Sequence, residues 1–72
     1  MERIDLTKKL KRAMLELDIS QLELAKAVEQ TQSNLSQKFI ANNFKLSEYQ
    51  RLVEALGCML EINIVLPTGE KV

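Results

Sequence analysis

Four amide or hydroxyl side chains stand close together in this sequence: Gln32, Ser33, Ser36 and Gln37. At helical spacing they look away from Leu35 and Phe39, an i, i+4 apolar pair. A glutamine can donate and accept a hydrogen bond at once, which matches the N6 donor and N7 acceptor of adenine in the major groove of DNA. The pattern predicts a helix near residues 32–39 whose outer face contacts base edges, with the glutamines giving more selectivity than the short serines.

Charge is distributed unevenly around this segment. Residues 30–47 contain no acidic residue, and their two basic residues are Lys38 and Lys45. With Asn42 and Asn43, these lysines are expected to contact DNA phosphates, which sets the register of a helix on DNA without reading its sequence. The whole chain has ten basic and ten acidic residues and a pI near 6.2, so its salt dependence should be shallow. A merely solvated helix face is the alternative interpretation.

The composition argues against several other classes of protein. The chain has no histidine, and its one cysteine, Cys58, cannot form an internal disulfide. A zinc site or a Cys-His nucleophile therefore lacks ligands, and we expect no metal and no cofactor. There is no glycine-rich phosphate loop and no pair of carboxylates suited to one cleft, so an enzyme is not expected. Without a long apolar run or a signal-peptide pattern, we expect a cytoplasmic protein with no membrane contact and no small-molecule substrate.

Helices that could position the polar face are indicated on both sides of it. An apolar stripe predicts an amphipathic helix that is capped by Asp5 and carries Leu6, Leu10, Ala13, Met14 and Leu17. Ser20 and Glu23 form a capping box, so a second helix should begin near Gln21. Thr31 can cap the third helix.

A fourth helix should close the core after a loop at residues 40–45. Ser47 and Gln50 have the spacing of a second capping box, and Gly57 can supply the C-cap. The apolar face between them contains Tyr49, Leu52, Val53 and Leu56. We therefore assign residues 1–57 to one small, mainly α domain.

The period of the sequence changes in residues 58–72. Leu60, Ile62, Ile64 and Leu66 alternate with other residues, which predicts a half-buried strand that ends at Pro67 and Gly69. Three residues after Gly69 are too few for a return strand of any length, and a lone strand leaves its backbone unpaired. The same strand of a second copy, antiparallel about a two-fold axis, is the economical partner, with these four apolar residues at the dimer interface. Pairing with residues 1–4 of the same chain is the alternative.

These features together resemble the helix-turn-helix of lambda-repressor and Cro-type proteins, the XRE-like family. The resemblance covers residues 6–57 and rests on Gln21, Leu24, Ala25, Val28, Thr31, Gln32, Ser33 and Leu35. It implies a four-helix domain in which Ala25 allows two helices to approach closely. It also implies that Gln32, Ser33 and Gln37 face base edges, and that Gln21 and the loop around Asn42 and Asn43 contact phosphates. Thr31, at the start of the same helix, is placed among the phosphate contacts.

The sequence departs from the family pattern at three positions. Glu29 stands in the turn where the family prefers glycine, so either left-handed backbone costs on the order of 1 kcal/mol there or the turn is shaped differently. Lys38 replaces an apolar residue, with Phe39 beside it available for the core. Met14 replaces a basic residue that often reaches a phosphate. Each departure weakens the expected contacts with the DNA backbone and leaves the base-contacting face intact.

The sequence therefore favours a regulator of transcription that binds double-stranded DNA as a homodimeric repressor at a palindromic operator. The competing class is a protein-interaction module that pairs its C-terminal strand with another protein, in which case the neutral charge and Glu29 would reflect lost DNA binding. An antitoxin that binds both its toxin and DNA would combine the two.

Overall fold

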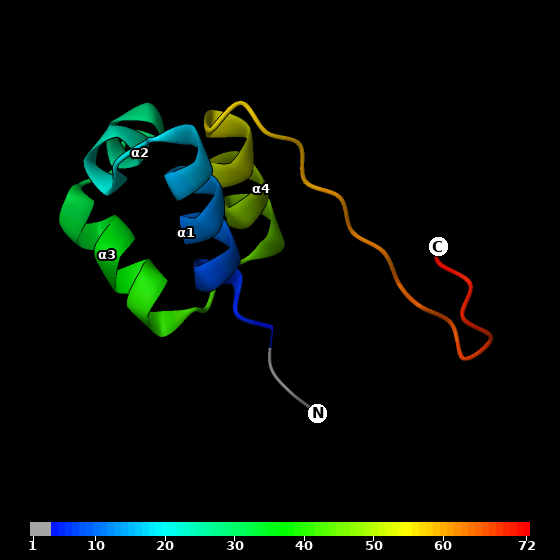
Figure 1. The fold of residues 1–72 in the computed structure, drawn as a ribbon. Coiled ribbons are helices and arrows are strands. Elements are labelled where there is room, and N and C mark those ends of the chain that lie inside the picture. The colour runs from blue at the N-terminus through cyan, green and yellow to red at the C-terminus, as the bar shows by residue number, and fades with distance from the viewer. Residues whose placement is uncertain (1–3) are drawn as a thin grey trace.

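The computed structural model describes residues 4–72, in which four helices surround one core (Figure 1). They are α1 (Leu6–Leu17), α2 (Gln21–Ala27), α3 (Gln32–Ala41) and α4 (Leu46–Ala55). The expected small, mainly α domain is confirmed. No helix in residues 4–72 is long and apolar enough to cross a bilayer.

Local capping fixes where the first three helices begin. The Asp5 carboxylate accepts from the Lys8 amide at 2.9 Å, and the Thr31 hydroxyl accepts from the Asn34 amide at 3.1 Å. Ser20 and Glu23 form both bonds of the predicted capping box, each 3.1 Å long. These side chains satisfy amides that have no partner within the helix.

The predicted capping box at Ser47 and Gln50 is wrong. Helix α4 begins earlier, at Leu46, with Lys45 as its N-cap and no side-chain capping bond. Tyr49 sets this start: its amide donates to the Lys45 carbonyl at 3.0 Å, and its hydroxyl donates to the Leu6 carbonyl at 3.0 Å. Packing of the buried Tyr49 against α1 thus decides the boundary, rather than a local cap.

Left-handed residues end the helices. Asp18, Glu29 and Asn42 have φ values of 56°, 57° and 50°, and Gly57 follows α4 with φ 80°. Gly57 donates to Glu54 and Cys58 donates to Val53, which is the Schellman pattern and confirms the predicted glycine cap. Glu29 adopts left-handed backbone although it has a β-carbon. Of the two alternatives expected for this turn, the structure therefore shows the left-handed one.

The core comes from all four helices. Its buried apolar side chains are Leu10, Met14, Leu24, Ala25, Val28, Leu35, Phe39, Tyr49, Leu52, Val53 and Leu56. Leu17 departs from the predicted stripe: it is 45% exposed, because α1 ends there and the chain turns at Asp18. The ring of Phe44 stacks edge to face between Phe39 and Tyr49, which ties the loop after α3 to α4.

The C-terminal segment, residues 58–72, runs away from the helices in extended form and turns back near its end (Figure 1). The predicted strand at Leu60–Leu66 is not formed as such, since within residues 4–72 the ladder is limited to one isolated bridge between Val65 and Lys71. The prediction of no return strand is also corrected in part, because Glu70–Val72 do return beside Ile64–Leu66. The alternative expectation is pairing of this strand with residues 1–4, of which residues 1–3 lie outside the described residues.

Candidate nucleic-acid interface

Helices α2 and α3 pack against each other and are joined by a short turn. The Ala25 side chain is fully buried, and its carbonyl accepts from the Gln30 amide at 2.9 Å across the turn. Glu29 donates to Lys26 within the same turn. Leu35 and Phe39 anchor the inner face of α3 in the core, so its opposite face is left to solvent.

The recognition face, defined as Gln32, Ser33, Ser36 and Gln37, is brought together on α3. Gln32, Ser33 and Gln37 are exposed, whereas Ser36 is half-buried. Thr31 is exposed at the start of the helix. Its hydroxyl oxygen accepts the capping hydrogen bond, and the hydroxyl hydrogen can still be donated to a phosphate. Gln21, the remaining predicted contact on α2, is half-buried at the first turn of that helix.

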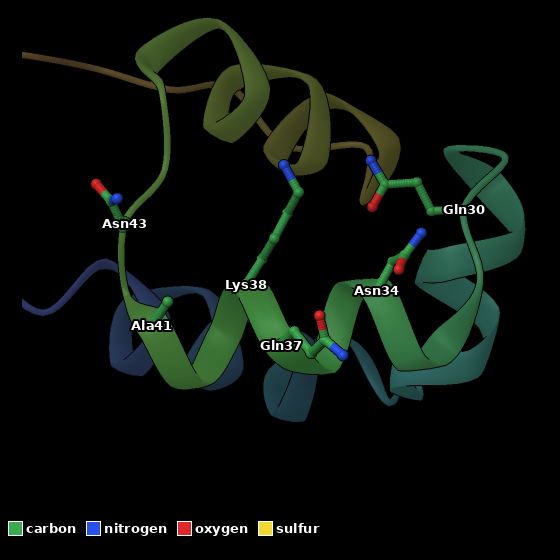
Figure 2. A pocket seen from close by; sticks show the side chains of 6 residues that line it. All are labelled: Gln30, Asn34, Gln37, Lys38, Ala41 and Asn43. Atoms are coloured by element: carbon green, nitrogen blue, oxygen red, sulfur yellow. The ribbon is translucent and has the colours of Figure 1, made fainter.

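A shallow hollow of about 420 Å³ flanks the recognition face. Figure 2 shows its lining side chains, from the end of the α2–α3 turn, from α3 and from the following loop: Gln30, Asn34, Gln37, Lys38, Ala41 and Asn43. Gln30 and Asn34 were not predicted as site residues. The spacing of Asn34, Lys38 and Ala41 on one side of α3 could have indicated Asn34, but the approach of Gln30 depends on the shape of the turn.

The Gln30 side chain has an unusual position in this hollow. Its amide oxygen is buried and accepts no hydrogen bond from another residue in the part of the chain that the structure describes. Buried polar atoms in folded proteins normally have a partner, so the Gln30 oxygen is an exception to that rule within residues 4–72.

The charge of Lys38 is compensated inside the protein. Its ammonium forms an ion pair with the Glu48 carboxylate of α4, and both side chains are only partly exposed. Glu48 lies one residue beyond the acid-free stretch of the sequence, and packing of α4 brings it back beside α3. A phosphate contact from Lys38 must therefore compete with this carboxylate.

The two asparagines after α3 have different environments. The Asn42 amide oxygen accepts from the Thr7 amide at 3.1 Å, and its nitrogen donates to the Ile4 carbonyl at 3.3 Å. Asn42 thus links the end of α3 to the start of α1, so a phosphate would compete with these bonds. Asn43 and Lys45 are exposed.

Three basic side chains of α1 and α4 have partners within the protein. The Lys11 ammonium lies 5.8 Å from the centroid of the Phe39 ring, and Arg12 lies 3.9 Å from Glu16 in an exposed pair. Arg51 donates to the Val28 carbonyl at 3.2 Å, where it supports the last turn of α2. These three side chains would have to leave their partners to contact a phosphate.

Two ionisable groups near these elements have shifted pKa values. Hydrogen bonds from the Ser20 backbone, and then from its side chain, lower the pKa of the exposed Glu23 carboxyl. Burial raises the pKa of Tyr49, because it disfavours the phenolate. Both groups stay in their ordinary charge states near neutral pH, and both serve the helical framework.

No family model, no curated protein and no solved structure matches this chain. The functional assignment therefore depends on the geometry and chemistry of the chain itself.

Proposed function

We propose that this chain is a sequence-specific double-stranded DNA-binding regulator of transcription, acting as a homodimeric repressor at a palindromic operator. The observation that carries the proposal is the recognition face: exposed amides and hydroxyls on α3, with the opposite side of the helix fixed in the core. A helix positioned in this way can enter the major groove and present side chains to base edges. The resemblance of the sequence pattern in residues 6–57 to lambda-repressor and Cro-type domains agrees with the same proposal.

Gln32 and Gln37 are the proposed base contacts, and each can contribute about 1–3 kcal/mol of discrimination in favour of adenine. Ser33 and Ser36 add shorter polar contacts. Phosphate contacts would come from Thr31, Gln21, Asn43 and Lys45, and from Lys38 when it leaves Glu48.

A dimer supplies what a single domain lacks. Few uncompensated positive charges face the DNA, so one copy should bind weakly. Two copies place two α3 helices in successive major grooves, about 34 Å apart, and the contacts of both half-sites add. A symmetric protein then requires a palindromic site.

Selection of bound duplexes from a random DNA pool tests this function. The wild-type chain should enrich a palindrome, and a chain with Gln32→Ala and Gln37→Ala should lose that enrichment. Gln50→Ala is the matched control, because Gln50 is an exposed glutamine on α4, outside the recognition face. Failure of the wild-type chain to enrich any sequence at low or moderate salt would contradict the proposal.

A protein-interaction module is the second candidate, and one specific observation favours it. Ile62, Ile64 and Val65 of the C-terminal segment are each more than half exposed, beside a backbone edge that another protein could pair with. That function needs Ile64 and does not need Gln37. An Ile64→Lys chain that loses a partner protein while Gln32→Ala, Gln37→Ala retains it would support this candidate.

A further inference from the structure

The C-terminal segment forms a short hairpin whose geometry can be stated residue by residue. Ile64 and Val72 exchange two backbone hydrogen bonds, of 2.8 and 2.9 Å, and Leu66 donates to Glu70 at 2.8 Å. The loop is Pro67, Thr68 and Gly69, with Gly69 at φ 93° and its amide bonded to the Leu66 carbonyl. This is a three-residue hairpin loop with a left-handed glycine. The backbone amides and carbonyls of the even-numbered residues Ile64 and Leu66 are thus already bonded within the hairpin.

The opposite edge of the same stretch is free. In an antiparallel ladder, the residue between two hydrogen-bonded positions turns its amide and carbonyl to the other side. Val65, which lies opposite Lys71 in the bridge, therefore turns these groups outward. The chain before Ile64 is extended (Figure 1), and the same two-residue alternation carried along it places the groups of Asn63 and Glu61 on this side. Within residues 4–72 no backbone hydrogen bond reaches these three residues. An open edge of this kind is a template for another strand.

The side chains of the hairpin leave one apolar face uncovered. Ile62, Ile64 and Leu66 alternate onto one face, and Val72 joins it opposite Ile64. Their exposed fractions are 58%, 64%, 36% and 60%. Leu60, one step closer to the helices, instead packs against the core. A second copy of the segment can both pair the free edge and cover this face.

We infer that two copies pair antiparallel through the edge formed by Glu61, Asn63 and Val65, with Asn63 on the two-fold axis. This inference depends on the dimer of the proposed function and specifies its register. The usable edge begins after Leu60, which is held by the core, and ends before Pro67, which has no amide hydrogen to donate. Asn63 is the midpoint of that edge, so pairing there uses all of it.

The register has consequences for both faces of the paired strands. Asn63 lies opposite the partner's Asn63, and Ile62 lies opposite the partner's Ile64, which joins the two apolar faces into one. On the other face, Val65 has its own Lys71 on one side and the partner's Glu61 on the other, so opposite charges flank each interface valine. Sliding one strand by a single residue, so that Asn63 lay opposite the partner's Ile64, would require the backbone groups of Ile64 that the hairpin already uses.

Disulfide formation between single cysteines measures this register. The experiment uses the full chain with Cys58→Ser, to which Asn63→Cys, Ile62→Cys or Ile64→Cys is added one at a time, and the cross-linked dimer is quantified after mild oxidation. Residues directly opposite each other have Cα atoms about 5.5 Å apart in a hydrogen-bonded pair, which suits a disulfide. Asn63→Cys should therefore cross-link, whereas Ile62→Cys alone and Ile64→Cys alone should not, because diagonal neighbours lie about 7–8 Å apart.

Mixing the Ile62→Cys and Ile64→Cys chains should give a cross-linked heterodimer, since these two positions face each other. Cross-linking by Ile62→Cys alone or by Ile64→Cys alone would instead put that residue on the axis and overturn the inference. The oligomeric state of the Cys58→Ser chain, measured by sedimentation, distinguishes a wrong register from the absence of a dimer. Dimers without the Asn63→Cys cross-link refute the register only, monomers refute dimerisation, and DNA selection with the same chain tests the proposed function independently.

Discussion

The Lys38 ammonium on α3 is ion-paired with the Glu48 carboxylate at the first turn of α4. Each group also lies near a helix end of favourable sign, since Lys38 is in the last turn of α3. The pair links the two helices on one side of the hollow and removes a positive charge from the surface that we propose contacts DNA.

Glu48→Gln should strengthen DNA binding. The substitution leaves Lys38 without a competing carboxylate, so one more phosphate contact can form and the log–log salt slope should steepen by about 0.9. Affinity for the selected duplex, measured by fluorescence anisotropy at several salt concentrations, tests this expectation. Glu54→Gln makes the same charge change elsewhere on α4, and equal effects of the two substitutions would show that only net charge matters.

Asn42 should contribute to stability through its backbone and its side chain separately. Asn42→Gly keeps the left-handed backbone but leaves the Thr7 amide without its acceptor, which should cost about 1–3 kcal/mol. Asn42→Ala loses the same bond and adds about 1–2 kcal/mol for left-handed backbone with a β-carbon. The free energy of unfolding in urea should be highest for wild type, lower for Asn42→Gly and lowest for Asn42→Ala. Equal stability of the two variants would contradict the backbone contribution.

Glu29→Gly should stabilise the domain by about 1 kcal/mol, because glycine adopts φ 57° without the clash of a β-carbon. Glu29→Ala is the control, since it removes the charge and keeps the β-carbon. Denaturant midpoints of the two variants should differ in favour of glycine. A larger gain for alanine would mean that the Glu29 charge, and not its backbone, is the main cost.

The capping box at the start of α2 should make stability depend on acid pH. The pKa of Glu23 is lower in the fold than its ordinary value, so the carboxylate stabilises the native state. This contribution is fully present above the pKa of the unfolded chain and is lost as pH falls through the folded value. The stability difference between wild type and Glu23→Gln should therefore shrink in acid. Ser20→Ala removes the side-chain hydrogen bond and keeps the backbone amide, so NMR titration should show the Glu23 pKa rising only part of the way in this variant. An unchanged pKa there would refute the side-chain contribution.

Features set by neighbouring residues could be predicted from the sequence, and features set by distant contacts could not. The caps at Asp5, Ser20 and Thr31 each involve a side chain and an amide three residues on, so local spacing was sufficient. The start of α4 depends on Tyr49 reaching Leu6, which outweighed the local Ser47 signal.

The candidate site follows the same division. The alternation of α3 between core and solvent was readable from Leu35 and Phe39, and the structure places both in the core. The approach of Gln30 and Glu48 to α3 was not readable, because it depends on how the turn and α4 pack. In the C-terminal segment the alternation was visible, but pairing by so short a return as Glu70–Val72 was not expected.

Base contact by the glutamines of α3 is tested most directly by a double-mutant cycle between protein and DNA. Each adenine of the selected site is replaced in turn by 7-deazaadenine, which lacks the N7 acceptor, and affinities are measured for wild type, Gln32→Ala, Gln37→Ala and the Gln50→Ala control. At one adenine or more, we expect the analogue to weaken binding by wild type and by the Gln50→Ala control by about 1–3 kcal/mol. At the same adenine, the analogue should not weaken binding by the α3 variant that already lacks the contacting glutamine. Equal losses for all four proteins at every adenine would contradict adenine reading by α3.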